Sequence, residues 1–169
     1  MANNKRPRKA YRPRQIIVNT LEVAAHNAAK PAKEDRIEVL SQLRKAVKAL
    51  REGVATEMQW SIASGSLAVS LAIEKQGKVR GLQEHFESIE QALQDIYDRA
   101  LLAGGGRWIR VTLRFNEIEA LNLLVDLQRF QMDQLGRAEF LQAVDAAQKE
   151  TIAQGHTVAV VRDLERMAA

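Results

Sequence analysis

Apolar residues recur at helical spacing along most of this 169-residue chain. Between Pro31 and Arg51 they fall at steps of three and four, which predicts an amphipathic helix with one buried face. A second run steps four, three, four, three and four from Leu82 to Ala100, and its glutamates fall outside the apolar stripe. This run predicts a helix that packs along one seam, and its three heptads also leave an intermolecular coiled coil, and so a homodimer, open.

A central helix is predicted over residues 56–73. Its apolar residues lie on nearly every side of the helix, and the small residues between them would let neighbouring helices approach closely. Thr56 and Gln59 have the spacing of a capping box, which marks the start of this helix. Gly53 is expected to stop the helix before it.

Three more helices are expected from capping and glycine signals. Asn116 and Glu119 have the spacing of another capping box, which predicts a deeply buried helix that ends at Gly136. A further helix is predicted over residues 138–154, and a short one over residues 20–29.

The period of the pattern changes to two after the glycines at 104–106. Ile109, Val111 and Leu113 then alternate with Trp108, Arg110, Thr112 and Arg114. Such alternation is typical of a strand, which needs a partner strand. The β-rich candidates for that partner are residues 15–18 and 157–161.

These patterns predict a mainly α fold class, a helical bundle of about five to six helices with room for a small two- or three-stranded β element. We expect residues 15–169 to form a single helical domain. Residues 1–14 are expected to be a disordered basic arm. A domain of this size buries enough surface to build a core without disulfides or metals.

The net charge of +4 hides an uneven distribution. Residues 1–14 hold six Lys and Arg and no acid, whereas residues 15–169 hold 19 basic and 21 acidic side chains. An extended arm of this kind suits contact with phosphates or with acidic protein. The arm residues predicted to bind a partner or nucleic acid are Lys5, Arg6, Arg8, Lys9, Tyr11, Arg12 and Arg14.

Two further basic sets are candidates for the same contacts. Arg44, Lys48 and Arg51 share one helix face, and Arg107, Arg110 and Arg114 lie with Trp108 in the predicted strand. An ordinary solvated face would give the same pattern. The glycines at 104–106 could cradle a phosphate, but a flexible connector explains them better because the Lys-Ser/Thr ending of a P-loop is missing.

No recognisable catalytic pattern occurs in the sequence. The absence of cysteine excludes disulfides, zinc–thiolate sites and thiol chemistry, and the three histidines lack the spacing of metal ligands. Glu117, Glu119 and Asp126 could converge on a site, although the first two also fit the first turn of a helix. We therefore expect no enzyme, no metal and no cofactor.

The expected location is the cytoplasm. The charged N-terminus lacks the apolar stretch of a signal peptide. The longest uncharged run, residues 58–73, is short and polar for a membrane span, so no membrane contact is expected.

Three stretches in combination resemble small accessory proteins of temperate phages and prophages. They are KRPRKAYRPR in the arm, ALREGVATEMQW at 49–60 and AIEKQGKVRGL at 72–82. The resemblance implies a role as an accessory or anti-defence inhibitor that binds a host protein or nucleoprotein complex stoichiometrically, and it assigns no site residue. The function expected is thus a non-enzymatic binding protein with a protein partner. The alternative is a sequence-nonspecific nucleic-acid-binding protein that uses the basic arm.

Overall fold

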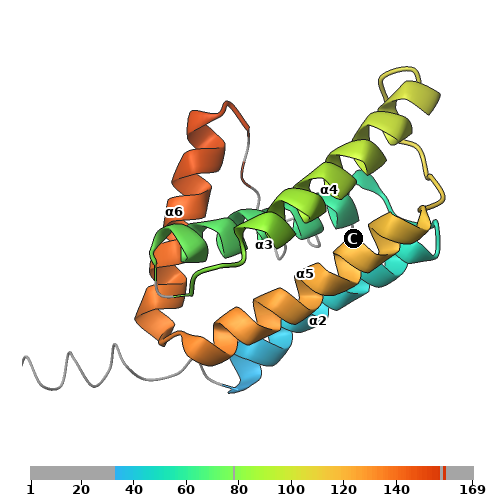
Figure 1. The fold of residues 1–169 in the computed structure, drawn as a ribbon. Helices are drawn as coiled ribbons and strands as arrows, with labels where there is room; N and C mark the ends of the chain where they lie inside the picture. The colour runs from blue at the N-terminus through green and yellow to red at the C-terminus, as the bar shows by residue number, and fades with distance from the viewer. Residues whose placement is uncertain (1–32, 78, 157, 159–169) are drawn as a thin grey trace, which may run out of the picture.

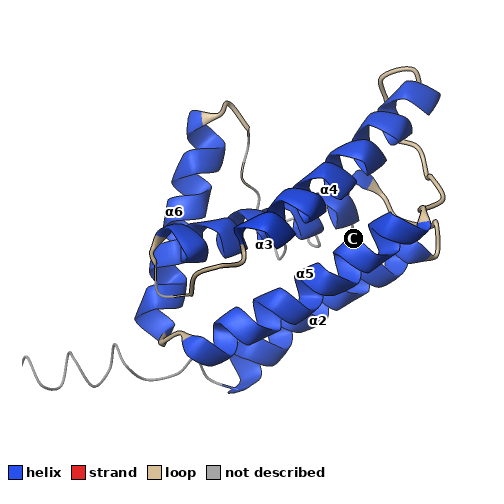
Figure 2. Ribbon diagram, viewed as in Figure 1, coloured by secondary structure: helices blue, strands red, loops and turns tan. Residues whose placement is uncertain are grey.

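The computed structural model describes residues 33–77, 79–156 and 158, and its elements are helices (Figure 1). They are α2 (Lys33–Arg51), α3 (Glu57–Lys75), α4 (Gln83–Ala103), α5 (Phe115–Gln134) and α6 (Arg137–Ala153). These residues contain no strand (Figure 2). The mainly α fold class and the helical bundle are confirmed. The basic arm and the helix expected at 20–29 lie outside the described residues.

Helix α3 is the centre of the bundle, as its apolar composition predicts. It contacts α2, α4, α5 and α6. At its start the side chain of Gln59 accepts hydrogen bonds from the backbone N–H of Thr56 at 2.7 Å and from its hydroxyl at 2.6 Å. The predicted capping pattern is confirmed. None of the described helices, α3 included, is long and apolar enough to cross a membrane.

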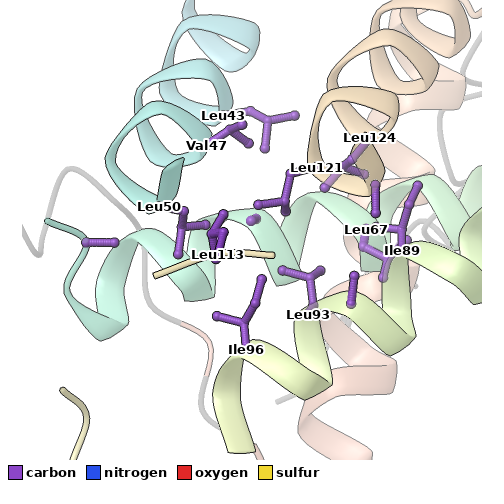
Figure 3. Packing of buried hydrophobic residues seen from close by; sticks show 14 of the residues in the cluster. Leu43, Val47, Leu50, Leu67, Ile89, Leu93, Ile96, Leu113, Leu121 and Leu124 are labelled. Atoms are coloured by element: carbon purple, nitrogen blue, oxygen red, sulfur yellow. The ribbon is translucent and has the colours of Figure 1, made fainter. Parts of the chain in front are cut away.

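The main core lies between α2, α3, α4 and α5 (Figure 3). Its larger buried side chains are Leu43, Val47, Leu50, Leu67, Phe86, Ile89, Leu93, Ile96, Leu113, Leu121 and Leu124. A second cluster, which includes Ile73, Val79, Leu135 and Ala143, lies where α6 packs on α3. The seam predicted over residues 82–100 is therefore filled by α3 and α5 of the same chain.

Helix α5 begins earlier than the sequence pattern suggests. Its N-cap is Arg114, whose backbone N–H donates to the carboxylate of Glu117 at 2.8 Å. The predicted capping box of Asn116 and Glu119 is therefore wrong. Glu117 lies three residues after Arg114, and Glu119 lies three residues after Asn116, so both glutamates have the spacing of a capping box. Glu117 caps the helix because it is buried at this turn, whereas Glu119 is exposed.

The strand predicted at 108–114 is also wrong, because this segment is an extended connection without a ladder partner among the described residues. Leu113 is buried on one side, while the indole of Trp108 on the other side donates to the carbonyl of Ala55 at 3.1 Å. Residues on both faces of the segment thus contact the bundle, at different points. These contacts produce an alternation of residue types along the segment without a β-sheet. The proposed partner strands at 15–18 and 157–161 fall outside the described residues, except for Val158.

Candidate binding surface at the basic end of the bundle

Two basic segments that are distant in sequence meet at one end of the bundle. The turn between α2 and α3 lies beside the connection between α4 and α5 (Figure 1). A Cβ atom at Gly53 would lie 3.9 Å from the carbonyl oxygen of Val111. We call this region the basic end and define it by four exposed side chains, Arg51, Arg107, Arg110 and Arg114.

The other two residues of the predicted α2 face lie farther from this end. Arg44 is exposed but seven residues before Arg51, about 10 Å along the helix axis. The ammonium of Lys48 lies 3.8 Å from the carboxylate of Glu52 in an exposed ion pair. The structure therefore brings Arg51 together with the 107–114 segment, but not Arg44.

Exposed apolar side chains lie among these arginines. They are Val54 at 50% exposure, Leu102 at 86%, Ile109 at 40% and Phe115 at 75%. They come from the α2–α3 turn, the last turn of α4, the connection and the first residue of α5. Grouped apolar exposure of this kind marks interaction surfaces. The alternating pattern places Ile109 in a predicted strand, and no pattern singles out Val54, Leu102 or Phe115, whose exposure is seen only in the fold.

An aromatic cluster of Trp60, Tyr97 and Trp108 packs next to the basic end. The rings of Trp60 and Tyr97 stack with centroids 4.4 Å apart, and Trp108 lies 6.3 Å from Trp60 and 6.1 Å from Tyr97. The indole N–H of Trp60 donates to the carbonyl of Leu93 at 2.9 Å, and that of Trp108 is bonded to Ala55. Trp108 is half-buried and holds the connection in place, and its contact with a partner stays a prediction.

A partly buried ion pair joins three segments at this end. The guanidinium of Arg99 in α4 donates to both carboxylate oxygens of Glu117, through Nη1 to Oε1 and through Nη2 to Oε2 at 2.7 Å. Nη2 also lies 3.4 Å from the carbonyl oxygen of Thr112. Because Glu117 also accepts the Arg114 amide, the pair joins the end of α4, the connection and the start of α5.

The surroundings of Glu117 favour its ionised form. Burial is the largest influence and raises the pKa of this carboxyl group. The hydrogen bonds from Arg99 and from the Arg114 amide, with the positive charges of both arginines, outweigh burial and hold the pKa below its ordinary value. Glu117 is therefore an anchor of the fold, which separates it from the exposed Glu119 and Asp126. The three carboxylates do not converge on one site.

The glycines at 104–106 form a tight connection rather than a phosphate cradle. The amides of Gly104, Gly105, Gly106 and Arg107 all donate to backbone carbonyls, at 2.9 to 3.3 Å. Gly105 and Gly106 have φ of +62° and +88°, which glycine adopts without strain. Because these amides are already paired, they are not available to a phosphate.

Two of the three histidines lie in the part of the chain that the structure describes. His85 and His156 are exposed, and no group of three or more His, Cys, Asp or Glu residues there could hold a metal ion. His26 and the arm residues Lys5 to Arg14 lie outside that part. Comparisons of the chain with protein-family models, curated proteins and solved structures find no match.

Proposed function

We propose that this chain is a non-enzymatic binding protein that docks an acidic protein partner on the basic end. The observation that carries the proposal is the arrangement of exposed arginines around exposed apolar side chains, above all Leu102 and Phe115. Protein interfaces are enriched in arginine and in aromatic side chains, and the basic end exposes Phe115 together with its arginines. The aromatic cluster and the Arg99–Glu117 pair hold the surface in one shape, which lowers the entropy cost of binding.

The chemistry of the basic end favours protein over nucleic acid. Phosphate contacts need cations, and protein–nucleic acid interfaces are more polar and more positively charged than those between proteins. Here the aliphatic side chains of Val54, Leu102 and Ile109 stand among the arginines. They would gain little from a phosphate backbone, whereas an acidic partner with apolar residues would pair with both kinds of side chain.

The basic arm gives this binding a long-range component. Its six cations lie before α2 in the chain, and they would raise the association rate with an acidic partner at low salt. The resemblance to phage accessory proteins supports a partner in the host and a stoichiometric, inhibitory role. The accessory or anti-defence inhibitor is therefore the specific form of the proposal.

Capture experiments with charge-reversed variants test the proposal. The tagged full chain, treated with nuclease, is expected to recover one specific protein from a host lysate. The double variant Arg110→Glu/Arg114→Glu should lose that protein, because both substitutions reverse charge within the basic end. The matched control Lys45→Glu/Arg137→Glu makes the same charge change at exposed positions elsewhere and should keep it. Equal capture by the two double variants, or nothing above background, would contradict the proposal.

The nucleic-acid alternative has its own signature in the same experiments. Capture that disappears after nuclease treatment would favour it. Direct titration with DNA or RNA would then show a steep loss of affinity between about 50 and 200 mM salt, with a smaller slope after removal of residues 1–14. No binding at low salt would eliminate this alternative.

A further inference from the structure

A groove of about 400 Å³ lies between α4 and α5. Its apolar lining includes Ala92, Ala120 and Leu123, and the carboxylates of Asp95 and Glu119 also line it. The volume falls in the range of about 300–1,000 Å³ that is usual for binding sites. None of the contacts proposed for the basic end involves these residues.

Negative charge continues along the groove on both helices. Asp126 follows Glu119 by seven residues, about two turns, and so lies on the same side of α5. Glu84 precedes the groove residue Ser88 by four residues and so lies on the same side of α4. Glu84, Glu119 and Asp126 are exposed. A segment bound in the groove would therefore meet carboxylates from both walls.

The arginines of the two helices leave this negative charge in excess. Helix α4 carries five acidic residues and one arginine, Arg99, which donates to both carboxylate oxygens of Glu117. Helix α5 carries four acidic residues and one arginine, Arg129, which is not among the residues that line the groove. The groove thus suits a basic segment that also contains an apolar or aromatic side chain.

The basic arm has this composition. Residues 1–14 hold six Lys and Arg, no acid, and one aromatic side chain, Tyr11. Lys9 and Arg12 lie on either side of Tyr11 in the sequence. A tyrosine ring packs on apolar surface while its hydroxyl stays in water, and cations form charge-assisted hydrogen bonds with carboxylates. The arm therefore complements both the apolar lining and the charge of the groove.

The groove is within reach of the arm of the same chain. Arg36, near the start of α2, pairs with Asp133, near the end of α5, at 2.9 Å. Glu119 precedes Asp133 by fourteen residues, about 21 Å along the axis of α5, and passing around the helix adds about 10 Å. Residues 15–32 separate the arm from α2, and these 18 residues span up to about 60 Å when extended.

We propose that the basic arm docks in the groove of its own chain. The ring of Tyr11 packs on the apolar lining, and Lys9 and Arg12 pair with Asp95 and Glu119. The covalent connection favours this occupant over a separate molecule, because a short linker gives a tethered segment an effective concentration of about millimolar. Weak charged contacts are populated at such a concentration.

The docked arm goes beyond the proposed function and limits it. The basic end stays open, but cations that are paired in the groove attract an acidic partner less strongly over long distances. The groove and the partner therefore compete for the arm. The two proposals fail independently, because arm docking is measured on purified protein with no partner present.

Paramagnetic broadening of NMR signals tests the contact in the full chain. The chain contains no cysteine, so Ala10→Cys provides a single attachment site for a nitroxide label beside Tyr11. The amide signals of the groove residues, Asp95 and Glu119 among them, should lose most of their intensity. Salt at about 1 M, where the Debye length is about 3 Å, should restore most of it. Groove signals that keep their intensity at low salt would overturn the proposal.

Two double variants separate the groove from a general charge effect. Asp95→Asn/Glu119→Gln keeps the shape of the groove, removes its carboxylates and should recover most of the lost intensity. The matched control Glu90→Gln/Asp145→Asn removes two charges outside the groove lining and should leave the broadening unchanged. Equal broadening in the two double variants would contradict the proposed ion pairs. If the groove variant fails to fold, Lys9→Gln/Arg12→Gln removes the same pairs from the side of the arm.

A mixed sample identifies which chain supplies the arm. Spin-labelled chain without isotope label is combined with isotope-labelled chain that carries no spin label. The groove signals should keep their intensity in this sample, because each groove is occupied by its own arm. Broadening as strong as in the singly prepared sample would place the arm of a second copy in the groove and would overturn docking within one chain.

Discussion

The ion pair between Arg99 and Glu117 offers the sharpest test of how the basic end is held. The substitution Glu117→Gln keeps the size of the side chain and removes its charge. A glutamine there can still accept the Arg114 amide, but it cannot accept both guanidinium N–H groups of Arg99 as a carboxylate does. The expected result is a less stable protein whose α4–α5 connection is loosened.

The size of the loss follows from the burial of the two partners. Glu117 is fully buried, whereas the side chain of Arg99 keeps 25% of its exposure. Breaking a fully buried pair costs about 3–5 kcal/mol. Because water reaches Arg99 and one backbone hydrogen bond survives, we expect Glu117→Gln to lower the free energy of unfolding by about 2–3 kcal/mol at pH 7.

The pH dependence of this difference has a definite sign. The pKa of Glu117 is lower in the folded protein than its ordinary value of 4.5. The stability it contributes is therefore complete above about pH 4.5 and is lost as the pH falls through the folded pKa. The difference in the free energy of unfolding between wild type and Glu117→Gln should therefore become smaller over that acidic range.

Urea unfolding followed by tryptophan fluorescence measures both effects. Both tryptophans of the chain, Trp60 and Trp108, contact Tyr97, which lies in α4 two residues before Arg99, so the signal reports on this end of the bundle. Glu119→Gln is the matched control, because Glu119 is exposed two residues along, and it should change stability by less than about 0.5 kcal/mol. Equal losses of unfolding free energy for Glu117→Gln and Glu119→Gln would refute the reasoning. So would a difference between wild type and Glu117→Gln that stays constant at low pH.

Three further substitutions test the core and the connection, each by urea unfolding. Phe86→Ala should cost about 3–5 kcal/mol because the ring is fully buried, and a loss below about 1 kcal/mol would contradict this packing. Gly104→Ala should cost more than about 1 kcal/mol, since its Cβ would lie 1.9 Å from the carbonyl oxygen of Arg107, and an unchanged midpoint would contradict that geometry. Trp108→Phe should cost at least about 1 kcal/mol through loss of the hydrogen bond to Ala55, and a neutral result would mean that this bond does not hold the connection.

Most of the helices could be predicted from the sequence, because a helix that is buried on one face has apolar residues at regular steps of three and four. The run between Pro31 and Arg51 and the run from Leu82 to Ala100 became α2 and α4, and the apolar residues on nearly every side of 56–73 identified the central helix. Local signals of this kind need no knowledge of the partner helix. The predicted strand at 108–114 was wrong because alternating residue types indicate an extended backbone whose two faces have different surroundings. The alternation does not indicate whether another strand lies beside the segment.

The candidate surface was only partly accessible, since it depends on contacts between distant residues. Arg107, Arg110 and Arg114 could be identified as a basic group, but not their approach to Arg51. Glu117 anchors the fold through its ion pair with Arg99, which lies eighteen residues earlier in the chain. Capping rules consider only residues within a few positions of a helix end, so they do not predict this pair. Leu102 and Phe115 each look unremarkable in sequence, and only the fold shows that both side chains are exposed.

The most direct test of the central claim is photo-crosslinking from the basic end. A photo-reactive benzoylphenylalanine would replace the exposed Thr112, which lies between Arg110 and Arg114, in one variant and the exposed Gln142 of α6 in another, and each would be irradiated in nuclease-treated host lysate. If the basic end is the docking surface, position 112 should give a covalent adduct with a specific acidic protein and position 142 should give none. An adduct with a host protein only from position 142, or equal yields from both positions, would contradict it.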